Sequence, residues 1–306
     1  MALLVTLMAL ALMTLLVMDF TTSAALGYRS AAGQADQLRA EYLARSGVNV
    51  GLSLLAADSR EDRLRRTPYD ALDEAWAQPY PPVKLGGGMA AVLIVDEGRK
   101  IDINLLVNPR TGRPNPIYIG IVQRLFQNIE VSPKLVPAIV DWLDPNSIES
   151  PGGAEAQYYL RLIPPYEPRN APMPTIGDLR MIRGVDDATF FILRRYLTVA
   201  PEPRVNINTA PPQVIAALLP QLSADPSTVK EIIQARTVKP FRMVTDVGNL
   251  AGLGSLSVPL MRLITTRSSY FAITGLGTYA GARQNIDAVF RRNANGTAML
   301  SNWHEG

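Results

Sequence analysis

The hydrophobic pattern of the chain begins with an uninterrupted apolar run at its N-terminus. Residues 1–18 contain no charged side chain, and the first charge is Asp19. At a helical rise of about 1.5 Å per residue, this run is about 27 Å long, close to the hydrocarbon core of a bilayer. It therefore predicts a cleaved signal sequence or a retained membrane helix. Its large apolar members are Leu3, Leu4, Val5, Leu7, Leu10, Leu12, Leu15, Leu16 and Val17.

The flanks of this run favour a retained helix. A secretory signal requires basic residues before its apolar core, and no Lys or Arg precedes this run. Residues 22–25 (TSAA) would nevertheless pass as a cleavage site. Residues 26–57 contain no proline, so the helix can continue beyond the apolar run. We predict one helix of more than fifty residues within residues 1–66, half in lipid and half packed on a folded head.

The continuation has helical amphipathic spacing. Ala31, Ala35, Leu38 and Tyr42 recur at intervals of three and four, which predicts that they form the face packed on the head. Glycine residues interrupt this stretch and weaken an isolated helix by roughly 1 kcal/mol each relative to alanine. They are Gly27, Gly33, Gly47 and Gly51.

Downstream, the pattern changes from strands to helices and back to strands. Residues 89–95 and 99–105 flank a turn and predict a β-hairpin. Thr209 is predicted to cap the helix that follows a short strand. We divide the chain into a membrane and assembly helix (1–66), a first part of an α/β domain (67–106), an inserted helical domain (107–204) and a second part of the α/β domain (205–306). Helices are expected at 117–128, 132–143, 187–197, 211–219, 226–236, 243–250 and 257–264, and strands at 269–276 and 285–290.

Composition argues against the common catalytic classes. The chain has no cysteine and one histidine, His304, which excludes Cys- or His-based zinc sites and leaves a Ser-His-Asp mechanism only a residue of the C-terminal tail. The absence of cysteine leaves the redox compartment open. The 30 basic residues are dispersed and balanced by 27 acidic ones, with a net charge of +3, so no nucleic-acid patch is indicated.

A cluster of oxygen-bearing side chains follows the helix predicted at 132–143. Such oxygens suit a hard cation such as Ca²⁺. Asp144, Asn146 and Glu155 occupy positions 1, 3 and 12 of a twelve-residue window, as in an EF-hand, but Glu149 stands where that motif requires glycine. The spacing leaves a looser calcium loop and a solvated acidic loop both open, and a hydrolytic carboxylate pair finds no further support. The members are Asp141, Asp144, Asn146, Glu149 and Glu155.

Residues 205–254 resemble tandem helix-hairpin-helix modules, such as those of competence proteins that bind DNA. In these modules a glycine hairpin offers backbone N–H groups to phosphate. The hairpin at 219–223 lacks glycine, whereas the next one keeps Gly252 and Gly254. Because one hairpin is broken and no basic stripe accompanies them, we favour a packing role. A membrane-tethered DNA-binding protein is the alternative function.

Five motifs together resemble the minor pseudopilin K of the type II secretion system. In chain order they are residues 1–5 (MALLV) opening a long helix, 98–104 (GRKIDIN), 141–144 (DWLD), 153–159 (GAEAQYY) and 205–210 (VNINTA). They span nearly the whole chain in the family's order. Family precursors carry a basic leader ending in glycine. None precedes Met1, so we expect a chain near its mature form or one truncated at its start.

The resemblance implies an α+β, type IV pilin-like fold, in which a long N-terminal helix lies on a small antiparallel sheet and a large all-α domain is inserted between strands. It implies a non-enzymatic subunit that assembles with minor pseudopilins I and J, and with other pseudopilins, into a pseudopilus tip that supports protein export across the outer membrane. It also implies a single-pass inner-membrane helix and a periplasmic C-terminal domain, without nucleic-acid or small-molecule ligands.

The resemblance further implies calcium, as one or two ions in the inserted domain. On this basis Asp144, Asn146, Glu149 and Glu155 are the expected ligands, with Asp141 as a further candidate.

Overall fold

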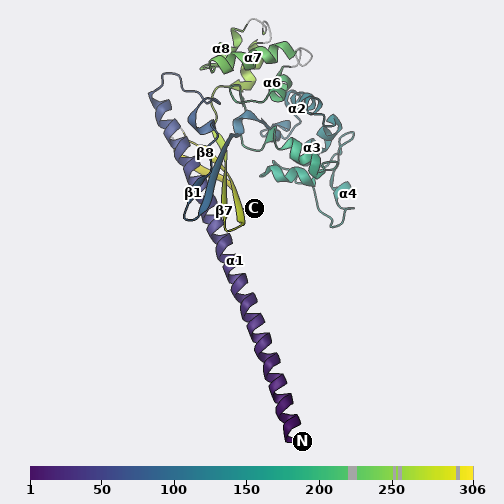
Figure 1. The fold of residues 1–306 in the computed structure, drawn as a ribbon. Helices are drawn as coiled ribbons and strands as arrows, with labels where there is room; N and C mark the ends of the chain where they lie inside the picture. The colour runs from purple at the N-terminus through teal and green to yellow at the C-terminus, as the bar shows by residue number, and fades with distance from the viewer. Residues whose placement is uncertain (220–225, 251–252, 254–256, 294–296, 306) are drawn as a thin grey trace.

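A long helix carries a folded head at one end in the computed structural model (Figure 1). Helix α1 runs from Ala2 to Leu64, 63 residues without a break, which corresponds to about 95 Å. We call residues 2–39 the stalk, because these side chains remain largely exposed, and the remainder the head. The structure describes residues 1–219, 226–250, 253, 257–293 and 297–305.

The buried face of α1 differs from the predicted one. Leu38 and Tyr42 are 51% and 61% exposed, and Ala31 and Ala35 are exposed too, so the predicted packing face is wrong. Small residues made the true face inconspicuous in a hydrophobicity pattern, because alanine and glycine carry little apolar surface. The buried residues of α1 are Ala40, Leu43, Ala44, Gly47, Val48, Gly51, Leu55, Asp58, Ser59 and Asp62.

Glycines on both sides bring α1 unusually close to the sheet. A Cβ atom on Gly47 would lie 2.4 Å from the Ala91 carbonyl oxygen, and one on Gly277 would lie 1.9 Å from the Ala40 carbonyl oxygen. Gly27 and Gly33, in the stalk, have no such neighbour within 4 Å. The helical glycines therefore divide into two kinds, of which only those in the head are required by packing.

The sheet is antiparallel, with the strand order β1-β2-β7-β8-β9. Ile94 lies opposite Ile273 in the β2–β7 pair, and both face a core under α1 that also contains Trp76 and Phe271. The short 3₁₀ helix η1 (Ala75–Ala77) holds Trp76 in that core. The strands are β1 (Val83–Leu85), β2 (Gly88–Asp96), β7 (Tyr270–Tyr279), β8 (Ala282–Arg292) and β9 (Ala298–Glu305).

The predicted hairpin between residues 89–95 and 99–105 does not form. Strand β2 pairs with β1 and β7, whereas the next strand, β3 (Ile101–Asp102), pairs in parallel with β4 (Leu197–Thr198). The alternation of 99–105 has another cause, since the Asp102 carboxylate is buried and accepts a bond from the Asn104 backbone N–H. The polar positions are thus used for turning the chain rather than for a solvent-facing edge.

Residues between β2 and β7 form a helical insertion with its own core. One hydrophobic cluster extends from Ile101 to Ile264, so the expected boundary at residue 204 lies inside a single core, and the sheet resumes at Tyr270. The helices of the insertion are η2 (Glu97–Arg99), η3 (Ile103–Leu106), α2 (Pro116–Asn128), η4 (Pro133–Leu135), α3 (Val136–Leu143), α4 (Ala156–Tyr159), η5 (Ile176–Met181), α5 (Asp187–Leu193), α6 (Pro212–Leu218), α7 (Pro226–Val238), α8 (Val244–Gly248) and α9 (Ser257–Leu263).

The insertion consists of two related halves. Each opens with a two-residue strand, β3 or β5 (Val205–Asn206), and closes with a parallel partner, β4 or β6 (Ile264–Thr265). We call residues 101–198 the first repeat and 205–265 the second repeat. Their opening sequences, IDIN at 101–104 and VNIN at 205–208, are similar.

The last asparagine of each opening sequence holds a distant loop of its own repeat. The Asn104 side chain donates to the Met173 carbonyl (3.0 Å) and accepts from the Met173 N–H (2.8 Å). Asn208 does the same with Phe241, at 2.9 Å in both directions. The side-chain amide thus replaces a backbone partner, and the repetition of this contact supports the equivalence of the halves.

Candidate functional site: an acidic loop, a buried junction and an apolar helix

The acidic loop begins at the C-terminal end of α3, in the first repeat. Asp141 lies in the last turn of α3, Asp144 is its C-cap, and Glu155 is the N-cap of α4. All three side chains are buried, at 0%, 1% and 4% exposure. The structure therefore buries three of the five predicted cation ligands, although nothing in a local hydrophobic pattern requires it.

The oxygens of this loop lack the partners that buried carboxylates need. Asp141 Oδ1 and both carboxylate oxygens of Glu155 have no hydrogen-bond partner among the described residues. The other Asp141 oxygen accepts from the Ser150 N–H at 3.1 Å. A Cβ on Gly153 would lie 1.8 Å from that oxygen, so the loop closes on Asp141 only with glycine there. Orphaned buried carboxylate oxygens are costly unless a cation satisfies them, and this donor set suits a hard divalent one.

The pKa values of the loop show the same deficit of positive charge. Burial, together with repulsion from Asp141 and Asp144, raises the pKa of Glu155 to about 7. Burial also raises the pKa of Asp144, against the effect of the hydrogen bond that its carboxylate accepts from the Asn146 N–H at 3.1 Å. A bound cation would lower the pKa values of these carboxylates, so that all of them could be ionised at neutral pH.

The remaining predicted ligands lie at the exposed rim of the loop. The Asn146 side-chain amide donates to Asp144 Oδ1 at 2.7 Å, and its oxygen accepts from the Ile148 N–H. Glu149 is exposed and lies 4.0 Å from Arg183, whose guanidinium also donates to the Gly153 carbonyl. Both side chains are therefore engaged in shaping the loop rather than directed towards Asp141 and Glu155.

A second acidic cluster, unpredicted from the sequence, joins α1 to the head. Oxygens of Asp58, Asp70 and Glu74 lie within 4.8 Å of one another and are buried. Here a buried guanidinium is present, because Arg292 donates to Asp58 at 2.8 Å and to both oxygens of Asp70, while Arg65 pairs with Glu74. The acids lie near one another in the sequence, but Arg292 comes from the C-terminal part of the chain, so no local signal could have identified the complete cluster. Its contacts describe an ion-pair network that fastens the end of α1.

The motif VNINTA forms a buried junction between the insertion and the sheet. The Asn206 amide donates to Asp96 Oδ2 (3.1 Å), Ser268 Oγ (2.9 Å) and the Asp70 carbonyl (3.1 Å). Thr209 was predicted to cap a helix, but its hydroxyl donates to the same Asp96 oxygen at 2.5 Å, and Pro211 takes the N-cap position. This motif therefore fixes the insertion on its support.

The apolar run forms the free end of the stalk. The nine predicted apolar residues, from Leu3 to Val17, are each between 59% and 76% exposed. Among the described residues, α1 is the one helix that has the length and apolar composition needed to cross a membrane. No single face of the run is buried, so its whole circumference is available to lipid or to neighbouring helices.

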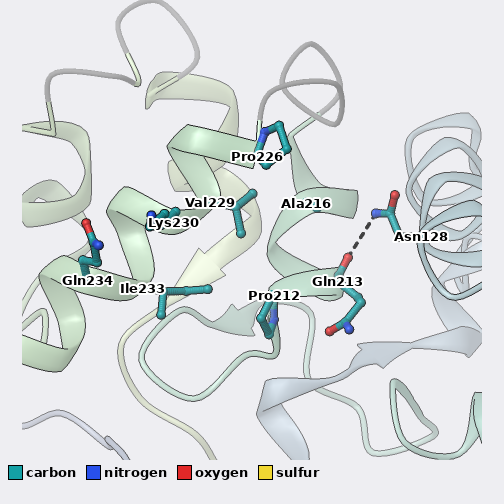
Figure 2. Close-up of a pocket in the computed structure, with 9 residues that line it drawn as sticks. All are labelled: Asn128, Pro212, Gln213, Ala216, Pro226, Val229, Lys230, Ile233 and Gln234. Atoms are coloured by element: carbon teal, nitrogen blue, oxygen red, sulfur yellow. Dashed lines mark hydrogen bonds between the residues drawn. The ribbon is translucent and has the colours of Figure 1, made fainter.

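The helix pairs that resemble helix-hairpin-helix modules have an apolar hollow on one side. This hollow has a volume of about 510 Å³. It lies between α2, α6 and α7, where the Asn128 amide donates to the Gln213 carbonyl (Figure 2). One of the nine residues drawn there, Lys230, is basic. Residues 220–223 of the first predicted hairpin, and Gly252 and Gly254 of the second, lie outside the described residues. The described wall is therefore suited to packing, whereas phosphate binding would need more positive charge.

These features define a class of protein: a pilin-like assembly subunit, with a membrane-length apolar helix that continues along an antiparallel sheet. Two family models, both described as type II secretion system (T2SS) protein K, match residues 99–202 and 205–267. Together they cover more than half of the chain, and they meet at the border between the two repeats. The chain belongs to the family of type II secretion system protein K, the minor pseudopilin family that its motifs resemble.

Relatives extend the similarity to the N-terminal helix and the sheet. Type II secretion system protein K of Pseudomonas aeruginosa is 28% identical over 302 residues, which cover 96% of this chain and 89% of the relative. The protein K of Aeromonas hydrophila is 25% identical over 318 residues, covering 98% and 95%.

The fold has a counterpart among solved structures. A chain of the crystal structure of the GspK–GspI–GspJ complex from the type 2 secretion system of enterotoxigenic Escherichia coli superposes with a TM-score of 0.77, at 19% identity. The match covers 91% of this chain and 99% of that chain. The predicted family and fold class, a long helix on an antiparallel sheet with an inserted helical domain, are thereby confirmed.

Proposed function

We propose that this protein is a tip subunit of a type II secretion pseudopilus, which acts by assembly and supports protein export across the outer membrane. The observation that carries the proposal is the polarity of the molecule. The exposed apolar run lies at one end of α1, and the insertion, which is wider than the stalk, lies at the other end (Figure 1).

This polarity suits a subunit that ends a helical assembly. An apolar helix surface is as compatible with neighbouring apolar helices as with lipid, so the stalk can leave the membrane and enter a bundle of similar helices. A head wider than the stalk blocks the position above it, so further subunits add only below.

The proposed partners are minor pseudopilins I and J, with other pseudopilins along the stalk. The support is the similarity of this fold to a chain of a complex named for GspK, GspI and GspJ. Before assembly, the apolar run would be a single-pass helix of the inner membrane, with the head in the periplasm.

We also propose that the acidic loop binds one or two calcium ions. Asp141, Asp144 and Glu155 would hold the ion through their buried oxygens, and Asn146 and Glu149 would join the ligand set by rotating from the rim. When bound, the cation supplies the positive charge that this loop lacks. The chain's own residues do the rest: Gly153 lets the loop close, and Ser150 orients Asp141.

Co-purification with partners tests the assembly proposal. The full-length chain, solubilised in detergent, is expected to form a ternary complex with minor pseudopilins I and J of the same secretion system at micromolar concentration. The absence of such a complex from chains that are each folded would contradict the proposal.

A complementation experiment tests the role of the stalk. In a strain lacking the gene, Leu10→Arg with Leu15→Arg is expected to abolish secretion, because each arginine at membrane depth costs about 2.5–3.5 kcal/mol. The matched control, Leu10→Ala with Leu15→Ala, keeps the run uncharged and should secrete normally. Equal secretion by both variants would argue against an assembly helix.

A further inference from the structure

A polar hollow of about 630 Å³ lies where the chain passes between the insertion and the sheet. Its walls come from the linker between the two repeats, the end of β6, the start of β7 and the end of β8. Three arginines line it: Arg204 in the linker, Arg267 after β6, and Arg291 in β8. Segments remote in the sequence therefore converge to place three arginine residues around one space.

Most of this positive charge has no acidic partner among the described residues. Arg204 and Arg291 are exposed, and neither side chain makes an ion pair or hydrogen bond with the described residues. Arg267 lies 3.5 Å from the buried Asp62 carboxylate, which is a long contact. The one acid in the lining is Glu202. Its carboxylate accepts a hydrogen bond from the Ser269 backbone N–H at 2.5 Å and forms no ion pair with the described residues.

The shape and chemistry of the hollow select a carboxylate-bearing protein segment. Arginine binds carboxylates through two parallel hydrogen bonds, and several arginines around one space favour a ligand with more than one negative charge. The volume falls in the range of pockets that hold ligands larger than a simple ion. Pro201 and Pro203 stiffen the linker wall, so little ordering is required when a ligand enters.

Other anionic surfaces fit less well. A nucleic acid needs cations along a stripe that follows its backbone, whereas these arginines surround one hollow. Lipid headgroups would lie near the apolar run. Asp62, which contacts Arg267, is about 68 Å further along α1 than Val17 at a rise of about 1.5 Å per residue.

We propose that this hollow receives an acidic segment of a partner minor pseudopilin, and that Arg204, Arg267 and Arg291 bind its carboxylates. The inference rests on the proposed function, since it supplies a contact for the assembly. It adds a position and a chemistry: an electrostatic contact at the base of the insertion, separate from the apolar contacts of the stalk.

Charge reversal tests this contact in the complete complex. Affinity of the full-length, detergent-solubilised chain for the partner minor pseudopilins I and J is measured from about 50 to about 400 mM NaCl, a range over which screening changes strongly. Arg204→Glu with Arg291→Glu is expected to weaken binding by about tenfold or more at low salt and to flatten the salt dependence.

A matched control has the same change in net charge elsewhere. Arg110→Glu with Arg113→Glu alters two exposed arginines on a turn of the first repeat, and this variant should bind as the wild type does. If the Glu variant melts at a lower temperature than the control, Arg204→Gln with Arg291→Gln replaces it, with a smaller loss expected. A wild-type complex that neither the Glu nor the Gln variant weakens would overturn this proposal alone. A wild type that forms no complex would overturn the proposed function, and this contact with it.

Discussion

The two repeats of the insertion use the same scaffold for different purposes. In each, an asparagine amide holds a loop, but the held residue lies 69 positions away in the first repeat and 33 in the second. The longer excursion contains the acidic loop, with Asp141, Asp144 and Glu155. A parallel strand pair and one asparagine contact are therefore enough to close the repeat, and additional chain between these fixed points can acquire a chemical role.

The opening sequences IDIN and VNIN differ at two positions, and the second of these, Asp102 against Asn206, changes the hydrogen bonding. The first has Asp102, which accepts one hydrogen bond from within its own motif. The second has Asn206, whose donors reach Asp96, Ser268 and Asp70 outside the repeat. The exchange of a carboxylate for an amide gives the second repeat N–H donors, and this repeat is the one that joins the insertion to the sheet.

Removing the amide of the second repeat should have the largest effect. Asn206→Ala leaves the fully buried Asp96 carboxylate with fewer donors, and Ser268 Oγ and the Asp70 carbonyl each lose a partner. At about 1–3 kcal/mol per unsatisfied buried group, the free energy of unfolding should fall by about 3–5 kcal/mol. The equivalent change in the first repeat, Asp102→Ala, should lower it by less than about 1 kcal/mol. Urea denaturation of both variants measures the difference, and equal losses would contradict the assignment of the junction to the second repeat.

Calcium should stabilise the protein through the first repeat. At about one hundred times the dissociation constant, Ca²⁺ should add about 2.7 kcal/mol to the free energy of unfolding and raise the melting temperature. Asp141→Asn with Glu155→Gln should abolish the shift without lowering the metal-free melting temperature. Asp73→Asn with Glu130→Gln, two exposed acids outside the loop, is the matched control and should retain the shift. A chelator-treated wild type that does not respond to added Ca²⁺ would end the calcium proposal.

The asparagine contacts should differ in strength between the repeats. Asn208 is 2% exposed, so Asn208→Ala leaves the backbone groups of Phe241 without water to replace the lost bonds. Asn104 is only half-buried. We expect losses of about 2 kcal/mol for Asn208→Ala and about 1 kcal/mol for Asn104→Ala. Denaturation gives the two values, and amide hydrogen exchange at Phe241 and Met173 shows whether each loop opens. A larger loss at Asn104 would reverse the predicted order.

The smallest expected effect concerns pH. The pKa of Glu155 rises from 4.5 to about 7 on folding, so the folded state holds a proton that the unfolded state has lost between these values. Stability from this group is therefore lost as pH rises from about 5 to about 7. In metal-free buffer the melting temperature of the wild type should fall more over this interval than that of Glu155→Gln. Buried acids outside the acidic loop contribute equally to both chains, so parallel curves would contradict the raised pKa.

Local sequence patterns predicted most elements. The uninterrupted helix, the helix of 116–128 and the strands at 270–279 and 282–292 follow from proline-free periodicity and from runs of β-prone residues. The acidic loop was found from its spacing, but only Asp141, Asp144 and Glu155 among its members are buried. Its burial depends on Gly153 approaching Asp141, a contact that spacing does not express.

Elements that depend on distant partners were predicted less well. The alternation at 99–105 suggested a hairpin, because a buried aspartate that turns the chain and a solvent-facing strand residue produce the same pattern. The prediction of the packing face of α1 was wrong because glycine and alanine, which permit the closest approach, contribute little to a hydrophobicity pattern. The ion pairs of Arg292 could not be predicted from a local pattern, because Arg292 lies far along the chain from its partners Asp58 and Asp70.

The amino-acid sequence alone determines the two-sided character of this protein. An uncharged run long enough for a bilayer, followed by a proline-free continuation, makes an exposed apolar stalk unavoidable, because both properties depend only on neighbouring residues. Only the tertiary structure decides which face of α1 meets the sheet, how Asn206 joins the insertion to its support, and that three arginines surround one hollow. Each of these depends on groups brought together across the chain, where close approach and the satisfaction of buried polar atoms, rather than local periodicity, select the arrangement.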